Sequence, residues 1–297
     1  MSLDDVLAQQ AGVISRDQAL GVGLSRNSID HRVRVRRWRP LHPCVYLAAG
    51  HRLDDEVRIR AALLWASDGA ILSGWAAAWW CELTAQPPAA VAVTVPRRRQ
   101  LRVRPDVDVR RHDIPEPDRA VHRGLAVTAP ALTVLEAAVE MGDSGSRFVD
   151  DVLRRGAVLF ADVHAAHSRN AGAAGSAAVG RLLAAVVDRS AADARRKLLV
   201  VLRGSRASGW TDSFQIAGHS VDVAFPAARV AVVVSGWAEP STVLRAKAGA
   251  ELQQAAAARG WTLLRYTWLD LNERPQMVMA QIAQKVARGM TVVGRTG

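Results

Sequence analysis

The fold of the amino-terminal region is decided by the stretch SRNSIDHRVR, residues 25–34. Ser25 favours the start of a helix, because its hydroxyl can accept a hydrogen bond from a free backbone N–H of the first turn. Ile29 and Val33 stand four positions apart, so a helix places both on one face, where they are expected to enter a core. The other side chains are mostly basic or amide and point outward. The stretch predicts a helix suited to reading DNA.

Two shorter helices are expected before this stretch. The first begins at Ser2, with Asp5 as the acidic partner of a capping box. The second begins at Ser15, with Gln18 closing another capping box. It ends in the GVG sequence at 21–23, where glycine permits a positive φ in a tight turn.

Two strands are expected after the helix. The run RRWRPLHPCVYL at 36–47 contains two short extended segments around a proline-bounded turn. Trp38 and Tyr46 are expected in the core that anchors this wing, because large aromatic side chains are usually buried. Residues 6–47 together predict a winged helix-turn-helix.

The third helix of such a unit enters the major groove, while flanking cations contact phosphates and fix the register. The candidate DNA contacts share a polar or basic side chain on this helix or the wing: Arg26, Asn27, Ser28, His31, Arg32, Arg34, Arg36, Arg37 and Arg39. Arg26, Asn27 and His31 are the candidates for base edges, and the later arginines for phosphates. The alternative is a winged helix that contacts protein. Six arginines against one acid between 26 and 39 disfavour it.

Composition supports a polyanionic partner. The chain has 297 residues, of which 49% are hydrophobic, enough for two or three compact units. Its formal net charge is +11, and basic side chains displace condensed counterions from nucleic acid. Cys44 and Cys81 provide neither a disulfide framework nor a metal-ligand spacing. An acidic amino terminus and the lack of a long apolar run predict a cytoplasmic protein, associated with the nucleoid when bound to DNA.

Five segments carry a resemblance to a known family: GVISR (12–16), GLSR (23–26), RWRPLHPCVY (37–46), SGWAAA (73–78) and LAVTAPALT (125–133). They resemble AbiEi-type antitoxins, the first three their amino-terminal winged helix. The resemblance implies a regulator of a type IV toxin-antitoxin system that represses its own operon and is encoded beside a nucleotidyltransferase-like toxin. Many relatives have glycine at the position of Cys44, so the turn there is expected to be built differently.

The middle of the chain predicts mixed helices and strands. Two helices between 53 and 80 are expected to be separated at 67–69, and strands are expected at 91–95 and 107–111. The loop between these strands holds four candidate secondary phosphate contacts: Arg97, Arg98, Arg99 and Arg102. The alternative is a solvated turn that nearby acids partly neutralise.

The last third predicts an α/β domain around a mixed sheet, with the order helix, strand, strand, helix, strand, helix. Three segments carry a second resemblance: GHSVDVAFP (218–226), ARVAVVVSGW (228–237) and GWTLLRYTWLDL (260–271). They resemble the DUF559 or very-short-patch-repair branch of restriction-endonuclease-like domains. Such nucleases hold magnesium between clustered carboxylates, which activate water against a phosphodiester.

The resemblance implies a metal site that is degenerate in this chain. Asp222 matches the first carboxylate, and Asp193 stands where a helix acid is found. Val233 and Ser235 occupy the positions of the acidic residues on the next strand, and a valine cannot coordinate a metal. No catalytic residue, metal or cofactor is therefore expected. Asp222 would instead pair with His219 or a nearby arginine.

Two other readings of this region stay open. A migrated acid would restore a metal site, with a basic side chain to stabilise charge; the candidates are Glu239, Glu251, Lys247 and Arg245. A sheet without catalytic carboxylates would serve to bind the toxin, to dimerise or to hold nucleic acid.

The sequence predicts an α/β protein, α+β overall, in four parts. These are a winged helix (1–50), a mixed antitoxin segment (51–160), a link with helical parts (161–189) and a non-catalytic endonuclease-like domain (190–297). The leading hypothesis is an antitoxin that represses its own operon, with double-stranded operator DNA and a nucleotidyltransferase-like toxin as partners, a homodimer on DNA and no membrane contact. The alternatives are a metal-dependent DNA endonuclease guided by the winged helix and a stand-alone transcriptional regulator.

Overall fold

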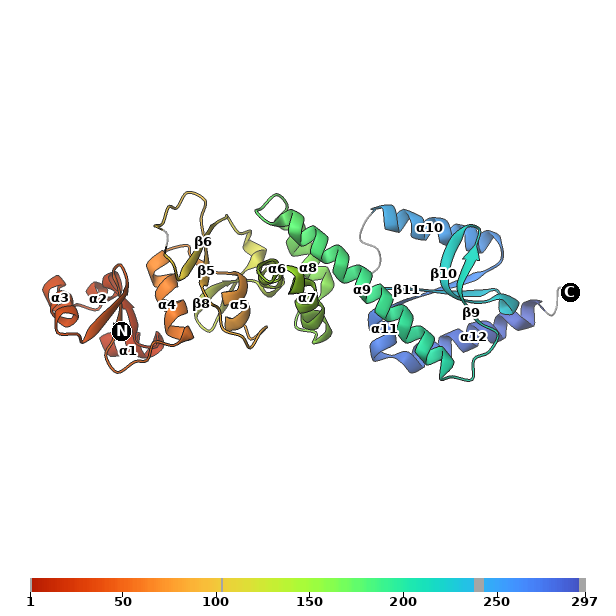
Figure 1. Ribbon diagram of the computed structural model, residues 1–297, viewed down its shortest axis with the longest axis horizontal. Helices are drawn as coiled ribbons and strands as arrows, with labels where there is room; N and C mark the ends of the chain where they lie inside the picture. The colour runs from red at the N-terminus through yellow and green to blue at the C-terminus, as the bar shows by residue number, and fades with distance from the viewer. Residues whose placement is uncertain (1, 103, 238–242, 294–297) are drawn as a thin grey trace. The chain divides into compact units, whose positions relative to one another are not determined.

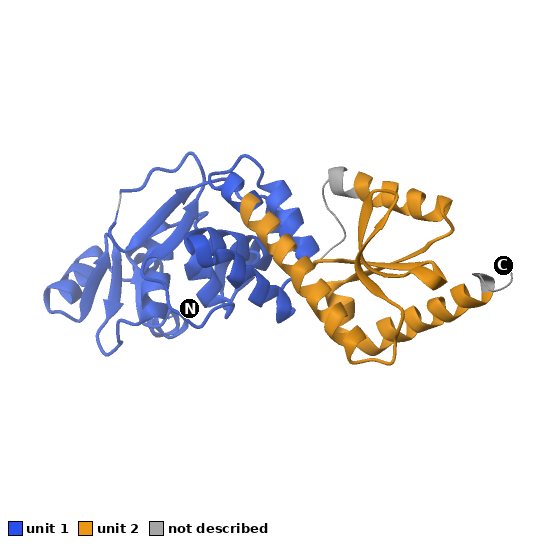
Figure 2. Ribbon diagram, turned by 45° about the vertical axis from the view of Figure 1, so that its right-hand side comes forward, with its two compact units in different colours: residues 1–180 blue, residues 181–297 orange. Residues whose placement is uncertain are grey.

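The computed structural model describes residues 2–102, 104–237 and 243–293 (Figure 1). It divides into two compact units, residues 1–180 and residues 181–297 (Figure 2). Helices and several small sheets make up both units, which confirms the predicted mixed α/β class. Within the described part of the chain, no helix is both long and apolar enough to cross a membrane.

The amino-terminal region has six elements: α1 (Leu3–Gln9), β1 (Val13–Ser15), α2 (Arg16–Gly21), α3 (Arg26–Arg34), β2 (Trp38–His42) and β3 (Val45–Ala48). The strands form an antiparallel sheet in the order β1-β3-β2. The capping boxes at Ser2 and Ser15 are present, and the Ser25 hydroxyl accepts from the Ser28 N–H, so the three predicted helix starts are confirmed. β1 was not predicted, because three residues carry too little pattern.

The core of this region is built as predicted. Ile29 is fully buried, and the rings of Trp38 and Tyr46 stack with centroids 5.6 Å apart. Cys44 lies in the turn between β2 and β3 with a φ of 61°, a left-handed conformation that glycine adopts at lower cost. This conformation gives a physical reason for a glycine at the same position in relatives.

The next region forms a five-stranded sheet. Its elements are α4 (Asp55–Ala66), β4 (Ile71–Leu72), α5 (Gly74–Trp80), β5 (Val91–Val95), β6 (Val107–Arg111), β7 (Arg119–His122) and β8 (Leu125–Thr128). The strand order is β6-β5-β4-β8-β7, with β5 and β6 parallel. The prediction of helix throughout 53–80, apart from the break, was wrong at β4, which is a strand because it pairs with β5 and β8. α4 and α5 pack against the sheet around the buried Trp80.

Four further helices follow: α6 (Pro130–Glu140), α7 (Gly145–Arg154), α8 (Phe160–Arg169) and α9 (Ser176–Arg203). α6 packs against α5, α7 and α8. Most of 161–189, predicted as a link with helical parts, therefore lies within α8 and α9. The boundary between the two units falls inside α9.

The second unit contains β9 (Thr211–Ile216), β10 (His219–Phe225), β11 (Val230–Ser235), α10 (Val243–Ala258), β12 (Thr262–Thr267), α11 (Trp268–Glu273) and α12 (Pro275–Val293). The strand order is β12-β11-β10-β9, and only β11 and β12 run parallel, so the predicted mixed sheet is confirmed. β9 and α11 were not predicted. One apolar cluster joins the sheet to α9, α11 and α12, and a second joins it to α10.

Candidate nucleic-acid interface

α3 presents one exposed face of polar side chains. Asn27, His31 and Arg34 are exposed and stand at positions i, i+4 and i+7, so they follow one another along the same side of the helix. Ile29 is buried in the core of the region. Arg34, predicted from the sequence to contact phosphate, thus lies in line with two residues predicted at base edges. Arg26 is exposed in the first turn.

The only acid of α3, Asp30, is bound by an arginine of α2. Arg16 Nη1 lies 2.9 Å from Asp30 Oδ1, and the same nitrogen donates to the Tyr46 hydroxyl at 3.3 Å. The hydrogen bond from Arg16 lowers the pKa of Asp30 below its ordinary value, against a small opposing effect of burial. The contact compensates the negative charge on α3 and ties α3 to α2. The sequence analysis did not predict the Arg16–Asp30 pair, for which the opposite charges of the two residues were the only signal.

Arg32 bonds to Ser28 within α3 and contacts Trp38 of β2. Arg32 Nη1 donates to the Ser28 carbonyl at 3.3 Å and also to the Ser28 hydroxyl. The same guanidinium lies over the Trp38 ring, 5.7 Å from its centroid. Both side chains are therefore occupied within the protein. The three wing arginines are exposed: Arg36, Arg37 and Arg39.

The basic loop between β5 and β6 places its arginines beside different neighbours. Arg99 Nη1 donates to the Asp68 carbonyl at 3.4 Å. Arg104 lies over the Trp65 ring at 5.9 Å, and it lines, together with Arg34, a shallow depression of about 600 Å³. Arg104 is thus the loop arginine nearest to α3 in this set, although it was not among the predicted phosphate contacts. The other three predicted contacts are exposed: Arg97, Arg98 and Arg102.

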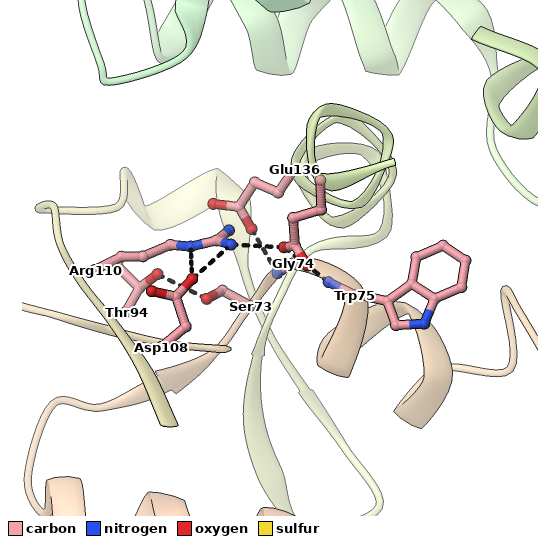
Figure 3. Close-up of polar contacts among 8 residues, drawn as sticks. Ser73, Gly74, Trp75, Thr94, Asp108, Arg110 and Glu136 are labelled. Carbon is pink, nitrogen blue, oxygen red and sulfur yellow. Dashed lines mark hydrogen bonds and ion pairs between the residues drawn. The ribbon is translucent and has the colours of Figure 1, made fainter. Parts of the chain in front are cut away.

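A charged network surrounds the start of α5 (Figure 3). Ser73 is the N-cap residue, but its side chain makes no capping bond. The first two N–H groups of the helix are instead bound by carboxylates of α6. Gly74 N–H donates to Glu136 Oε2 at 3.0 Å, and Trp75 N–H donates to Glu140 Oε1 at 3.0 Å. Two acids distant in the sequence therefore satisfy this helix terminus.

Arg110 joins these carboxylates to β6. Its Nη2 donates to Glu140 Oε1 at 2.7 Å and to Asp108 Oδ2 at 2.9 Å. Burial raises the pKa of Glu136, an effect that the Gly74 N–H and Arg110 oppose. Gly74 has a φ of 57°, and a Cβ there would lie 1.8 Å from Glu140 Oε1. Only glycine fits at this position.

The carboxylate of Asp222 on β10 is held by two groups of the protein. Its Oδ2 accepts the Val234 N–H at 2.8 Å, and its Oδ1 lies 3.6 Å from Arg195 Nε of α9. Burial raises the pKa of Asp222, against the opposing hydrogen bond from Val234 and the charge of Arg195. Asp222 therefore pairs with an arginine, one of the two partners suggested by the sequence.

The other positions of the predicted degenerate site have separate neighbours. Val233 packs with the apolar cluster that includes α10. The Ser235 hydroxyl donates to the Tyr266 carbonyl at 3.5 Å, and Asp193 lies 3.2 Å from Arg196 of the same helix. Asp222 nevertheless lies beside the strand that carries Val233 and Ser235, because it accepts the Val234 N–H.

The suggested replacement groups add no metal site among the described residues. Glu239 and the side chain of Arg245 lie outside them, and Lys247 and Glu251 are exposed on α10. Across the described ranges, no group of three or more histidine, cysteine or acidic side chains is placed to hold a metal ion.

These features define a mixed α/β protein with a basic, exposed helix near its amino terminus and a helix-covered sheet after it. Residues 70–185 match the family model described as the AbiEi antitoxin C-terminal domain. The match supports an AbiEi-type antitoxin and an antitoxin role in a toxin-antitoxin system. It confirms the family resemblance over residues 70–185, which include the segments at 73–78 and 125–133, while the winged-helix and endonuclease-like resemblances stay predictions.

Two further comparisons add little. The crystal structure of the RV2827C protein from Mycobacterium tuberculosis is similar at 17% sequence identity and a TM-score of 0.43, covering 60% of this chain and 74% of that chain. A structural similarity this weak supports no conclusion about this chain. No curated protein matches the chain.

Proposed function

We propose that this chain is a DNA-binding antitoxin that represses transcription of its own toxin-antitoxin operon. The antitoxin role rests on the matched residues 70–185. DNA binding rests on one observation, the exposed row of Asn27, His31 and Arg34 on α3. The order α1-β1-α2-α3-β2-β3 suits a winged helix-turn-helix, here assigned to residues 1–50.

The exposed side chains divide into two roles. Asn27, His31 and Arg34 are assigned to base edges, where asparagine suits adenine and arginine suits guanine. The exposed arginines of the wing are assigned to phosphates: Arg36, Arg37 and Arg39. Arg32 is assigned to holding α3 against the wing through Trp38, and Ser28 to orienting Arg32, because their polar groups are already bound.

The test is a binding titration of the full chain on DNA from upstream of its gene, with shuffled DNA as competitor, over a series of salt concentrations. Arg37→Ala should weaken binding to both DNAs and reduce the salt slope by about 0.9. His31→Ala should chiefly reduce the preference for the upstream DNA, by about 1–3 kcal/mol. Arg203→Ala removes the same charge from an exposed position of the second unit and is the matched control. Equal effects of all three variants would refute the interface.

The proposed protein partner is a nucleotidyltransferase-like toxin encoded beside the antitoxin. The repressor is proposed to bind its operator as a homodimer, because two reading heads on a two-fold site multiply the base contacts. Sedimentation of the protein–DNA complex tests this: one chain per operator would contradict it. Restored growth on co-expression with the neighbouring gene tests the toxin assignment, and the same toxicity with and without the antitoxin would contradict it.

The chain is proposed to act without catalysis, in the cytoplasm and on the nucleoid. Arg195 lies beside the Asp222 carboxylate, where a magnesium ion would need to bind, and Val233 offers no ligand atom. Operator DNA incubated with the protein and magnesium should therefore remain intact. Nicking that depends on magnesium and disappears in Asp222→Ala would overturn this assignment.

A further inference from the structure

A pocket of about 430 Å³ lies within the first unit, apart from the exposed face of α3. Its walls come from β5 and β6, from α6, and from the chain between the end of α8 and the start of α9. This volume is in the range of sites that bind small molecules. Nothing in the proposed DNA-binding role uses it.

The charged residues that line the pocket differ in sign and exposure. Arg97 and Arg111 line it and are exposed, so they can receive an anion from solvent. Glu136 lines it and is only partly exposed, and burial raises its pKa. Among the described residues, only Gly74 N–H donates a hydrogen bond to the Glu136 carboxylate, and it uses Oε2. A carboxylate has about four lone-pair sites, so Oε1 retains capacity to accept from a ligand.

The pocket also has an apolar lining. Leu132 and Leu135 of α6 are buried, and Val139 and Val179 lie beside them along the pocket. Aliphatic side chains of this kind bind the face of a planar ring by removing apolar surface from water.

One polar wall is fixed by bonds within the protein. Asp118 is fully buried, and its Oδ2 accepts from Asn170 Nδ2 at 2.7 Å. Because the amide nitrogen of Asn170 is used there, its Oδ1 is the acceptor for His112 Nε2 at 3.0 Å. His112 and Asn170 both line the pocket. Their orientation is therefore set before any ligand arrives, which reduces the entropy cost of binding.

We propose that this pocket binds a purine nucleoside monophosphate. The phosphate contacts Arg97 and Arg111, the base lies against the leucines of α6, and N–H groups of the base donate to Glu136. An α-amino acid fits less well, because both of its charged groups are attached to one carbon, whereas the arginines are exposed and the glutamate is partly buried. Guanine is favoured over adenine, since it presents two neighbouring N–H donors to a carboxylate that only accepts.

The test is calorimetric titration of the full chain with guanosine 5′-monophosphate. Arg97→Ala should weaken binding about tenfold or more, because a hydrogen bond to a charged group is lost. Arg98→Ala is the matched control, an exposed neighbour of the same charge that does not line the pocket. Ala174→Trp should block the exposed mouth, while Ala171→Trp adds the same ring outside the lining. Neither alanine is buried, so both variants should fold.

Saturable binding that Arg97→Ala and Ala174→Trp reduce, and that the two controls keep, supports the proposal. Guanosine and inorganic phosphate should each bind more weakly than the nucleotide, and adenosine 5′-monophosphate should bind more weakly as well. No binding at millimolar nucleotide, equal losses in the test and control variants, or phosphate alone binding as tightly as the nucleotide would overturn it. Equal affinity for the two nucleotides would overturn the contact with Glu136. DNA binding can fail in its own titration without affecting any of these outcomes.

Discussion

Replacement of Arg110 by alanine should remove the cation that holds the start of α5 together. Arg110 Nη2 donates to Glu140 Oε1 at 2.7 Å, and the same oxygen accepts the Trp75 N–H. Glu136 and Glu140 stand one helical turn apart on α6. Without the guanidinium, these two carboxylates keep only the backbone donors Gly74 N–H and Trp75 N–H, and Glu136 is partly buried. The loss of stability should therefore be large for a single substitution.

The magnitude follows from the exposure of the groups. Breaking a fully buried ion pair costs about 3–5 kcal/mol, and a hydrogen bond to a charged group contributes about 1.5–3 kcal/mol. The Arg110 and Glu140 side chains are 28% and 29% exposed, so solvent screens part of the interaction. We expect Arg110→Ala to lower the free energy of unfolding by about 2–3 kcal/mol, which corresponds to a fall in Tm of about 4–12 °C for a unit of this size.

The assay is urea unfolding of the full chain, with Asp108→Ala as the matched control. Asp108 contacts the same guanidinium at 2.9 Å, but its side chain is 53% exposed, so its loss should cost less than about 1 kcal/mol. The double variant Arg110→Ala with Glu140→Ala should show a coupling of more than about 0.5 kcal/mol. Equal costs for Arg110→Ala and Asp108→Ala, or no coupling, would refute the account of a buried network.

Three further results are expected. Burial raises the pKa of Glu136 above 4.5, so its ionisation penalises the folded state progressively as the pH rises from below 4.5 through the raised pKa. Glu136→Gln should therefore gain stability relative to the parent protein over that window in urea unfolding, and a pH-independent difference would contradict this. Burial raises the pKa of Cys81 to about 11, so at pH 7.5 iodoacetamide should label the exposed Cys44 much faster than Cys81. Mass spectrometry of peptides measures both labelling rates. Similar rates for the two cysteines would contradict the burial of Cys81. Cys44→Gly should stabilise the protein by about 1 kcal/mol in thermal unfolding, because the φ of 61° no longer opposes a side chain, and a loss of stability would show that the turn strain is misjudged.

Features that depend on near neighbours in the chain could be predicted. A capping serine acts on an N–H group three residues ahead, so Ser2, Ser15 and Ser25 were enough to locate three helix starts. The alternation of apolar residues likewise located β5 and β6. These signals lie inside the segment that they describe.

Features that depend on distant partners could not be predicted. β4 has two residues and exists only because β5 and β8 flank it. The donors at the start of α5 are bound by acids 62 and 65 positions away, a pairing that no local pattern indicates. Contacts between residues so far apart in the sequence can be identified only once the fold is known.

The same division applies to the proposed interface. Exposure of Asn27 and His31 followed from the positions of Ile29 and Val33, because a helix fixes which residues share a face. Arg104, in contrast, reaches the depression beside α3 from a loop in another sheet, and its place could not be read from its sequence neighbours.

The second unit shows why a single aspartate is weak evidence for nuclease chemistry. Arg195 Nε is buried and has no hydrogen-bond partner, so its charge is compensated across 3.6 Å by Asp222. Asp222 also accepts the Val234 N–H, which bonds β10 to β11 through a side chain. Removing the acid would leave Arg195 Nε and the Val234 N–H without a partner, and an unsatisfied donor costs free energy. The fold therefore has its own use for an aspartate at position 222, whereas Val233 packs into the apolar cluster with α10.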